Sequence, residues 1–193
     1  MRVELTPLQA RLAQHLTARN PRIEDDDTLI RAAVAVVFAP DPDAILFIRR
    51  AERADDPWSG HMSFPGGRSD EGDGDLLATA IRETKEEVGV LLRSDQLVGA
   101  LDDVAPRRTQ LPPIMVRPYV FVLDRRPALV LNQEVAEAVW APVHELLRPE
   151  AYYSMTRQVG EAERSYPAYR LGQRVVWGMT ERIVTPLLAL LST

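Results

Sequence analysis

The sequence predicts one mixed α/β domain with a central mixed sheet packed between helices. Two nearly continuous apolar runs, residues 30–38 and 44–48, are separated by a Pro- and Asp-rich turn, which is typical of two adjacent core strands. A third stretch, residues 76–88, instead spaces its apolar side chains along one face of a helix. The chain has 193 residues, of which 46% are hydrophobic, and this is enough to form one sizeable core.

The N-terminal segment is predicted to be a helix followed by a linker. Residues 5–16 carry apolar side chains at positions 5, 8, 12 and 16, and a Thr-Pro pair is a suitable helix start. The acidic run 24–27 is interpreted as solvated chain rather than as a metal site. We therefore expect residues 1–29 to pack as a helix and linker on a domain formed by residues 30–193.

The composition excludes several classes of function. Without cysteine, the chain can form neither disulfides nor a thiolate nucleophile or a cysteine-based zinc site. Its formal net charge of −5 offers no basic footprint for a nucleic-acid duplex, which favours a small substrate over a polymer. No stretch approaches the roughly 20 apolar residues of a membrane span, and residues 1–20 lack a signal-peptide core, so we expect a cytoplasmic protein without a membrane partner.

Residues 64–90, FPGGRSDEGDGDLLATAIRETKEEVGV, organise the rest of the chain. They predict a glycine turn, an acidic loop and then a helix, with Asp75 as the N-cap and Gly89 as the C-terminal stop. At about 100° per residue, the side chains of this helix fall on two distinct arcs. The inward arc is expected to contain Leu77, Ala80, Ile81, Thr84 and Val88, and the neighbouring arc Glu83, Glu86 and Glu87.

The glutamates of the second arc are badly placed for helix stability. Glu83 and Glu87 are like charges one turn apart, which costs roughly 0.2–0.5 kcal/mol. Negative charge near a helix C-terminus costs a further ~0.3–1 kcal/mol per group, and local compensation comes from Arg82, one turn before Glu86. The cluster therefore indicates a bound cation, and oxygen-only ligands favour Mg²⁺ first and Mn²⁺ second.

Within this helix, the segment RETKEEVGV at 82–90 resembles the second half of the Nudix box, R-E-U-x-E-E-x-G-U, at every charged and glycine position. Thr84 stands where the family usually has an aliphatic residue, and the pair Gly66-Gly67 stands upstream, as in the family pattern. The resemblance implies the Nudix α/β/α sandwich. It also implies a hydrolase that cleaves a diphosphate linkage with the help of a divalent metal.

The loop before the helix departs from the family pattern. If Gly67 is the box glycine, the loop is one residue longer than in the pattern, and the position of the first box glutamate falls on Gly74. Asp73 and Glu71 are nearby substitutes. Because that first glutamate usually has a supporting role, the departure concerns the loop geometry more than metal binding.

The resemblance also implies roles for single residues. Glu83 and Glu87 would bind Mg²⁺ directly, Glu86 would contribute to a second ion, and the Gly67 carbonyl would complete the shell. Arg82 would pair with Glu86 and hold it in register instead of touching the substrate.

Two further sets of residues are candidates for the site. Glu134, with Glu137 as the less favoured alternative, stands where many Nudix enzymes carry a glutamate that completes the metal site or acts as general base. Arg49, Arg50 and Arg53 follow the second strand, where they either contact a substrate phosphate or form an ordinary solvated strand exit.

The remaining elements are predicted to complete the sheet. Residues 96–101 and 114–123 are expected strands, and a short helix is expected at 143–147. Asp102 and Asp103, which follow the first of these strands, either reach the metal or are ordinary turn carboxylates.

Two segments near the C-terminus, YPAYR at 166–170 and VVWGMTERI at 175–183, suggest a substrate. They resemble the C-terminal part of bacterial coenzyme A diphosphatases of the Nudix superfamily, where a strand is followed by a turn and a closing helix. Gly60 and the FPGG segment at 64–67 match a further motif of that group, although Trp58 and its neighbour stand where the group tends to have histidine. The resemblance implies hydrolysis of coenzyme A or an acyl-coenzyme A to 4′-phosphopantetheine and 3′,5′-ADP.

Two alternatives stay open at this point. Pro106 lies close to the position of a proline that marks some ADP-ribose diphosphatases, so ADP-ribose or another nucleoside diphosphate derivative is the second candidate substrate. Nudix domains also serve as non-catalytic nucleotide sensors, commonly with a degraded box, whereas all the helix acids are present here. Many relatives are dimers, so a homodimer is a candidate assembly, but no stripe of residues identifies an interface.

Overall fold

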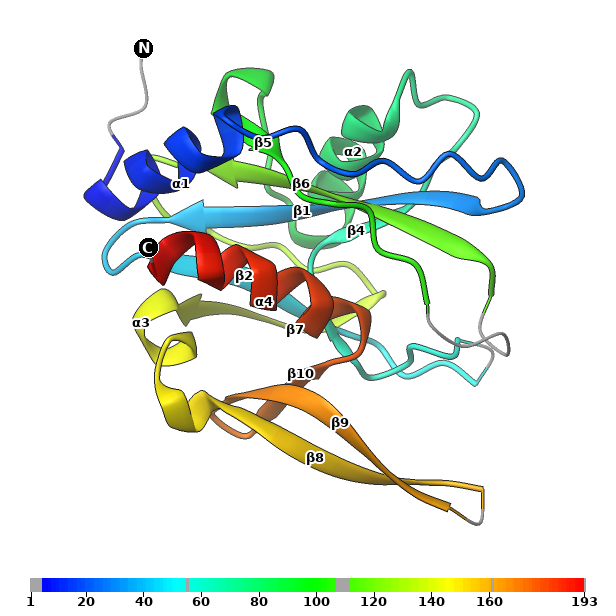
Figure 1. Cartoon of the computed structure of the whole chain (residues 1–193). Helices are drawn as coiled ribbons and strands as arrows, with labels where there is room; N and C mark the ends of the chain where they lie inside the picture. Colours follow the sequence, from blue (N-terminus) through cyan, green and yellow to red (C-terminus); the bar gives the residue numbers. More distant parts are fainter. Residues whose placement is uncertain (1–4, 55, 107–111, 161, 193) are drawn as a thin grey trace.

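The computed structural model of the chain describes residues 5–54, 56–106, 112–160 and 162–192. These residues form two sheets and four α-helices (Figure 1). The helices are α1 (Pro7–Thr17), α2 (Leu76–Val88), α3 (Val143–Leu146) and α4 (Met179–Ser192), with 3₁₀ turns η1 (Ser94–Gln96) and η2 (Pro149–Ala151). The strands are β1 (Ile30–Ala39), β2 (Ala44–Arg50), β3 (Met62–Ser63), β4 (Gly66–Arg68), β5 (Leu97–Ala100), β6 (Ile114–Val122), β7 (Val135–Pro142), β8 (Tyr152–Val159), β9 (Ala162–Leu171) and β10 (Arg174–Trp177). None of the described helices is long and apolar enough to cross a membrane.

The seven-stranded sheet is mixed, as predicted. Its strand order is β3-β2-β1-β6-β5, with β4 paired to β1 and β7 paired to β2. Strands β1 and β6 run parallel, from the pair Ile30 and Ile114 to the pair Phe38 and Val122. The other pairings of this sheet are antiparallel.

The side chains of β1 alternate between two separate cores. Phe38 belongs to a core that contains Leu16 of α1 and Leu187 of α4. Val37 points to the opposite face and belongs to a core that contains Ala80 of α2. Helices therefore cover both faces of the sheet (Figure 1), which confirms the predicted α/β/α sandwich.

A second, three-stranded antiparallel sheet, ordered β10-β9-β8, is absent from the sequence prediction. Strands β8 and β9 form a long ribbon, paired from Tyr152 and Tyr169 to Val159 and Ala162, that extends away from the central sheet (Figure 1). Most residues of β8 are exposed, so it lacks the apolar run that reveals a core strand. The prediction of a single sheet is therefore incomplete.

Helix α2 begins and ends where the sequence predicts. The Asp75 carboxylate accepts a hydrogen bond from the Ala78 N–H at 2.7 Å, which satisfies one of the free donors of the first turn. At the other end Gly89 has φ 72°, the left-handed conformation that stops a helix and favours glycine.

The inward face of α2 is rotated relative to the predicted arc. Leu77 and Ile81 are half-buried, whereas the buried residues include Leu76 and Thr79. Glu87, which the prediction assigns to the outer acidic arc, is only 2% exposed. The reason is that α2 packs against β4 as well as β1, so the side of the helix that carries Glu87 faces the interior.

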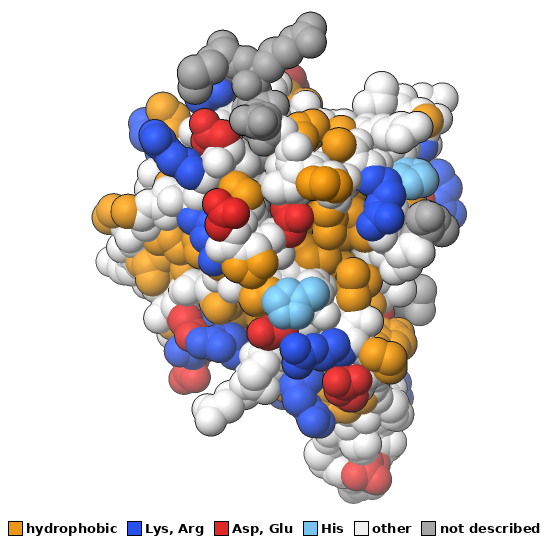
Figure 2. Space-filling view, turned by 90° about the vertical axis from the view of Figure 1, so that its left-hand side faces the viewer, with side chains coloured by type: hydrophobic (Ala, Val, Ile, Leu, Met, Phe, Trp, Pro, Cys, Tyr) orange, Lys and Arg blue, Asp and Glu red, His pale blue; other side chains and the backbone are white. Residues whose placement is uncertain are grey.

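Helix α1 is anchored in the core of the domain. Leu12 is fully buried and Leu16 is 3% exposed, and Thr6 and Gln9 form a reciprocal capping box at the helix start. The molecular face at the α1 and α3 end mixes acidic, basic and apolar side chains (Figure 2). The division into residues 1–29 and 30–193 stays a prediction, and residues 1–4 lie outside the described part of the chain.

We expect Leu12→Ala to lower the free energy of unfolding by about 2–5 kcal/mol, because the deleted side chain is fully buried. Denaturant unfolding followed by circular dichroism measures the change. The control is Gln14→Ala at an exposed position of the same helix, which should change stability by less than about 0.5 kcal/mol. Equal stability of the two variants would show that the domain does not depend on α1.

Candidate active site

The acidic turn at the end of α2 lies against the glycine turn of β4. A Cβ atom added at Gly67 would lie 2.4 Å from Oε1 of Glu83, so the Glu83 carboxylate occupies the space that a side chain would need. Gly66 has φ 152°, and a Cβ atom there would lie 2.2 Å from the Ala33 carbonyl oxygen of β1. Gly67 therefore permits the close approach of α2 to this turn, and Gly66 permits the close approach of the turn to β1.

Glu87 is a buried carboxylate. Its Oε2 atom accepts a hydrogen bond from the Gly66 N–H at 2.8 Å. Burial is the main cause that raises the pKa of Glu87 from 4.5 to about 8; the charge of Glu83 adds to the rise, and the Gly66 hydrogen bond and Arg50 oppose it. No arginine or lysine of the described residues lies within salt-bridge distance of Glu87.

Glu83 has a related but more open environment. Burial raises the pKa of Glu83, and the charges of Glu86 and Glu134 add to this, although Arg82 opposes the shift. Two neighbouring carboxylates thus have raised pKa values, chiefly because burial disfavours their charged form and secondarily because other glutamates lie nearby. Such an arrangement is typical of functional sites.

Arg82 ties the acidic turn to the preceding loop. Its Nε and Nη2 atoms each donate to Asp73 at 2.9 Å, and Nη1 donates to Glu83 at 2.9 Å and to Glu86 at 3.2 Å. The hydrogen bonds from Arg82 hold the pKa of Asp73 well below its usual range. The Arg82–Glu86 contact is the one expected from the sequence. Asp73, one of the two substitutes for the displaced first box acid, is the acid that meets Arg82.

The donor set of the acidic turn fits a hard divalent cation. Glu83, Glu86, Glu87 and the Gly67 carbonyl offer only oxygen atoms, which Mg²⁺ and Mn²⁺ prefer. In the described part of the chain, no three acidic or histidine side chains lie together in an arrangement that could hold a metal ion as they stand. Arg82 holds Glu83 and Glu86, so these contacts would have to rearrange around an ion. Coordination by these residues stays a prediction.

Glu134, the candidate general base, lies beside the acidic turn. Arg53 donates to its Oε1 atom at 3.0 Å. Its negative charge contributes to the raised pKa values of Glu83 and Glu87. Its role as general base stays a prediction. The alternative base Glu137 pairs instead with two arginines, which lower its pKa.

The arginines that the sequence assigns to a substrate phosphate are paired with acids in the structure. Besides the Arg53–Glu134 pair, Arg50 donates twice to Asp56, at 2.9 and 2.7 Å. Arg49 lies 3.5 Å from Glu137. A phosphate would have to compete with these carboxylates, and contact with substrate stays a prediction for all three arginines.

Asp102 and Asp103 do not join the acidic turn. Asp102 pairs with Arg19 and Arg22, and Asp103 accepts two hydrogen bonds from Arg117, at 2.8 and 2.7 Å. These pairs fasten the loop after β5 to β6 and to the segment after α1. These pairs favour the interpretation as structural turn carboxylates, and contact of either residue with a metal stays a prediction.

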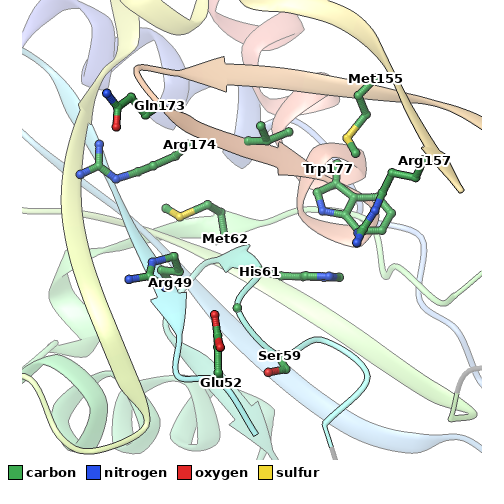
Figure 3. Close-up of a pocket in the computed structure, with 12 residues that line it drawn as sticks. Arg49, Glu52, Ser59, His61, Met62, Met155, Arg157, Gln173, Arg174 and Trp177 are labelled. Atoms are coloured by element: carbon green, nitrogen blue, oxygen red, sulfur yellow. The ribbon is translucent and has the colours of Figure 1, made fainter. Parts of the chain in front are cut away.

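A pocket that the sequence does not predict opens at the exit of β2. It has a volume of ≈ 520 Å³, and β2 and residues 59–62 face β8 and β10 across it (Figure 3). His61 and Trp177 lie in its wall with their ring centroids 4.7 Å apart. The sequence signal for this pocket is the C-terminal motif that contains Trp177. The residues of β8 show no pattern that predicts a binding site.

A comparison with family models classifies the chain. The model of the NUDIX domain matches residues 28–159, which is more than half of the sequence. The chain belongs to the NUDIX family. This confirms the prediction of a Nudix domain, and the match ends at the last residue of β8.

Relatives of this NUDIX protein include an uncharacterized protein of Schizosaccharomyces pombe, 38% identical over 131 residues, which are 65% of this chain and 40% of the relative. The human mitochondrial coenzyme A diphosphatase NUDT8 is 31% identical over 151 residues, which are 77% of this chain and 63% of NUDT8. The chain thus spans less than two thirds of either relative. The match to NUDT8 supports the resemblance to coenzyme A diphosphatases.

A solved structure shares the NUDIX fold. The MutT/nudix family protein from Enterococcus faecalis aligns with a TM-score of 0.60 over 93% of this chain and 67% of that chain, at 18% identity. At this identity the likeness concerns the fold alone.

The buried Glu87 predicts a pH-dependent stability of the metal-free NUDIX domain. The folded-state pKa of about 8 exceeds the ordinary 4.5, so between these values the unfolded chain loses the proton that the folded chain keeps. The free energy of unfolding therefore falls as pH rises from about 5 to 8, by up to about 1.4 kcal/mol per pH unit from this group. Glu87→Gln should remove this contribution.

Denaturant unfolding in EDTA at several pH values measures the effect. Glu86→Gln is the matched control, because Glu86 is exposed on the same turn, and this variant should keep the pH dependence of the wild-type protein. The assignment fails if Glu87→Gln and Glu86→Gln show the same dependence.

Proposed function

We propose that this chain hydrolyses the diphosphate linkage of a nucleoside diphosphate derivative, with coenzyme A or an acyl-coenzyme A as the substrate. The observation that carries the proposal is the buried carboxylate of Glu87 beside the partly buried carboxylate of Glu83, both held against the Gly66-Gly67 turn. The products would be 4′-phosphopantetheine and 3′,5′-ADP.

Mg²⁺, with Mn²⁺ as the alternative, is the proposed cofactor. When bound, it would neutralise phosphate oxygens and lower the pKa of the attacking water. Glu83 and Glu87 would hold it together with the Gly67 carbonyl, and Glu86 would contribute to a second ion. Their position supports this role, because a bound cation would stabilise carboxylates whose ionised form is disfavoured by burial and, to a lesser extent, by neighbouring negative charge.

The remaining residues would position the carboxylates, accept a proton or contact the substrate. Arg82 holds the Glu83 and Glu86 carboxylates on one side of α2 through hydrogen bonds of 2.9 and 3.2 Å. Glu134 would take the proton from the attacking water, which would require release of its pair with Arg53. Arg53, once free, would be available to a substrate phosphate, together with Arg49 and Arg50.

The substrate assignment is supported by the coenzyme A diphosphatase resemblance of the C-terminal segments. In the structure these segments form β9, β10 and the start of α4, and Thr180 at that start donates to the Met62 carbonyl at 3.0 Å. The C-terminal motif is thereby tied to the strand that leads into the glycine turn. A cytoplasmic location and a homodimer also stay predictions.

Product analysis tests the proposal. Purified protein would be incubated with Mg²⁺ and separately with coenzyme A, ADP-ribose, NADH, dinucleoside polyphosphates and nucleoside triphosphates, and the products identified by mass spectrometry. We expect 4′-phosphopantetheine and 3′,5′-ADP from coenzyme A. AMP and ribose 5-phosphate as the dominant products would favour ADP-ribose, and nucleotide binding without turnover would favour a sensing module.

Glu83→Gln and Glu87→Gln should each lower kcat by about two orders of magnitude or more, because each removes a negative ligand from the proposed metal site. Both variants should stay folded, since glutamine keeps the side-chain shape. Arg82→Ala should be milder, because Arg82 acts through the carboxylates that it holds.

Steady-state kinetics with the preferred substrate provides the measurement. Lys85→Gln, at an exposed position of the same helix, is the control and should keep the wild-type kcat. Retention of activity by both glutamate variants would rule out the acidic turn as the catalytic centre.

A further inference from the structure

The pocket beside β2 is basic, although the net charge of the chain is −5. Arg49, Arg157 and Arg174 line it, against one acidic lining residue, Glu52. Figure 3 shows Arg49 and Arg174 on one side of the hollow and Arg157 on the other. This lining favours an anion.

Arg157 stacks on an aromatic ring. Its guanidinium carbon lies 4.6 Å from the centroid of the Trp177 ring, so the cation is supported by the aromatic face. In the described part of the chain, no carboxylate lies within salt-bridge distance of Arg157. A guanidinium stacked in this way keeps the N–H donors along its edge available, and their fork geometry suits a phosphate.

The opposite side of the pocket has more guanidinium groups than paired carboxylates. Arg49 and Arg174 share one carboxylate, that of Glu137. The Nε atom of Arg174 is buried and finds no acceptor among the described residues. Because a buried donor without a partner is unfavourable, an acceptor brought by a ligand would stabilise this side.

The rest of the wall suits a flat organic group. The imidazole of His61 and the indole of Trp177 lie at 56° to each other, and Met62 and Met155 add flexible apolar surface. A single inorganic anion would leave this surface unused. A ligand that joins a phosphate to a nucleoside would use both parts of the lining.

The pocket adjoins the acidic turn through the exit of β2. Arg49 and Glu52 line the pocket, and Arg53, next along the chain, pairs with Glu134 beside the acidic turn. A substrate whose diphosphate lies at the acidic turn can therefore extend past this strand exit into the pocket.

We propose that this pocket binds a phosphomonoester on the nucleoside part of the substrate, with Arg157 as the main contact and Arg49 and Arg174 facing it across the pocket. The inference rests on the proposed function, because it assigns a specificity subsite to the same substrate. Coenzyme A carries such a group as its 3′-phosphate, whereas ADP-ribose does not.

Isothermal titration calorimetry with 3′,5′-ADP and with 5′-AMP, both in EDTA, tests the subsite, because the two ligands differ only by the 3′-phosphate. We expect the wild-type protein to bind 3′,5′-ADP at least about 10-fold more tightly, and Arg157→Gln to lose most of this preference. Arg170→Gln is the matched control, since Arg170 lies 4.7 Å from the Tyr153 ring in the same sheet but does not line the pocket. It should keep the preference.

Equal or undetectable binding of the two ligands by the wild-type protein overturns the subsite, and so does a preference that survives Arg157→Gln. The titration needs neither metal nor turnover, so its outcome is separate from that of the product analysis. If the preference depends on Arg157 but no diphosphate is hydrolysed, the proposed function fails and the subsite stands. If coenzyme A and dephospho-coenzyme A are hydrolysed with equal kcat/KM by the wild-type protein, the proposed function stands and the subsite fails.

Discussion

The close packing of α2 on the glycine turn of β4 is the contact on which the site depends. At Gly66 the turn approaches the backbone of β1, and at Gly67 it makes room for the Glu83 carboxylate. Since the turn donates a backbone N–H to Glu87, that carboxylate can be buried while one oxygen stays hydrogen-bonded. A side chain at Gly67 would displace the Glu83 carboxylate, and a side chain at Gly66 would push the turn away from β1. The same contact therefore explains the burial, the raised pKa values and the affinity for a cation that we propose.

The acidic helix could be predicted because its signals are local. The Asp75 cap, the Gly89 stop and the spacing of the glutamates each depend on residues close in sequence, and the structure has the cap and the stop where they were expected. The burial of Glu87 could not be predicted in this way. It depends on where β4 returns to the helix, and the angular spacing of side chains alone assigns this residue to the outer face.

The pocket depends on contacts that local patterns do not reveal. The ribbon of β8 and β9 is mostly exposed, so its strands lack an apolar run, and Arg157 has no sequence neighbour that marks it as functional. Its place in the pocket is set by the fold. Strand β10 places Trp177 against the Arg157 guanidinium, and the segment before β3 places His61 against Trp177. The exit of β2 joins the two regions, because it contributes Arg49 to the pocket and Arg53 to the pair with Glu134. Hydrolysis at the acidic turn and recognition of the nucleoside phosphate in the pocket would thus be carried by different parts of the fold, which meet at the exit of β2.

The most direct test of the account is a crystal structure of the protein grown with Mn²⁺, with the ion located by its anomalous scattering. We predict a peak at bonding distance from the carboxylates of Glu83 and Glu87 and from the Gly67 carbonyl, with Arg82 still bound to Asp73. A peak at another site, or none at an Mn²⁺ concentration that supports turnover, would contradict the claim that the acidic turn of α2 is the metal centre.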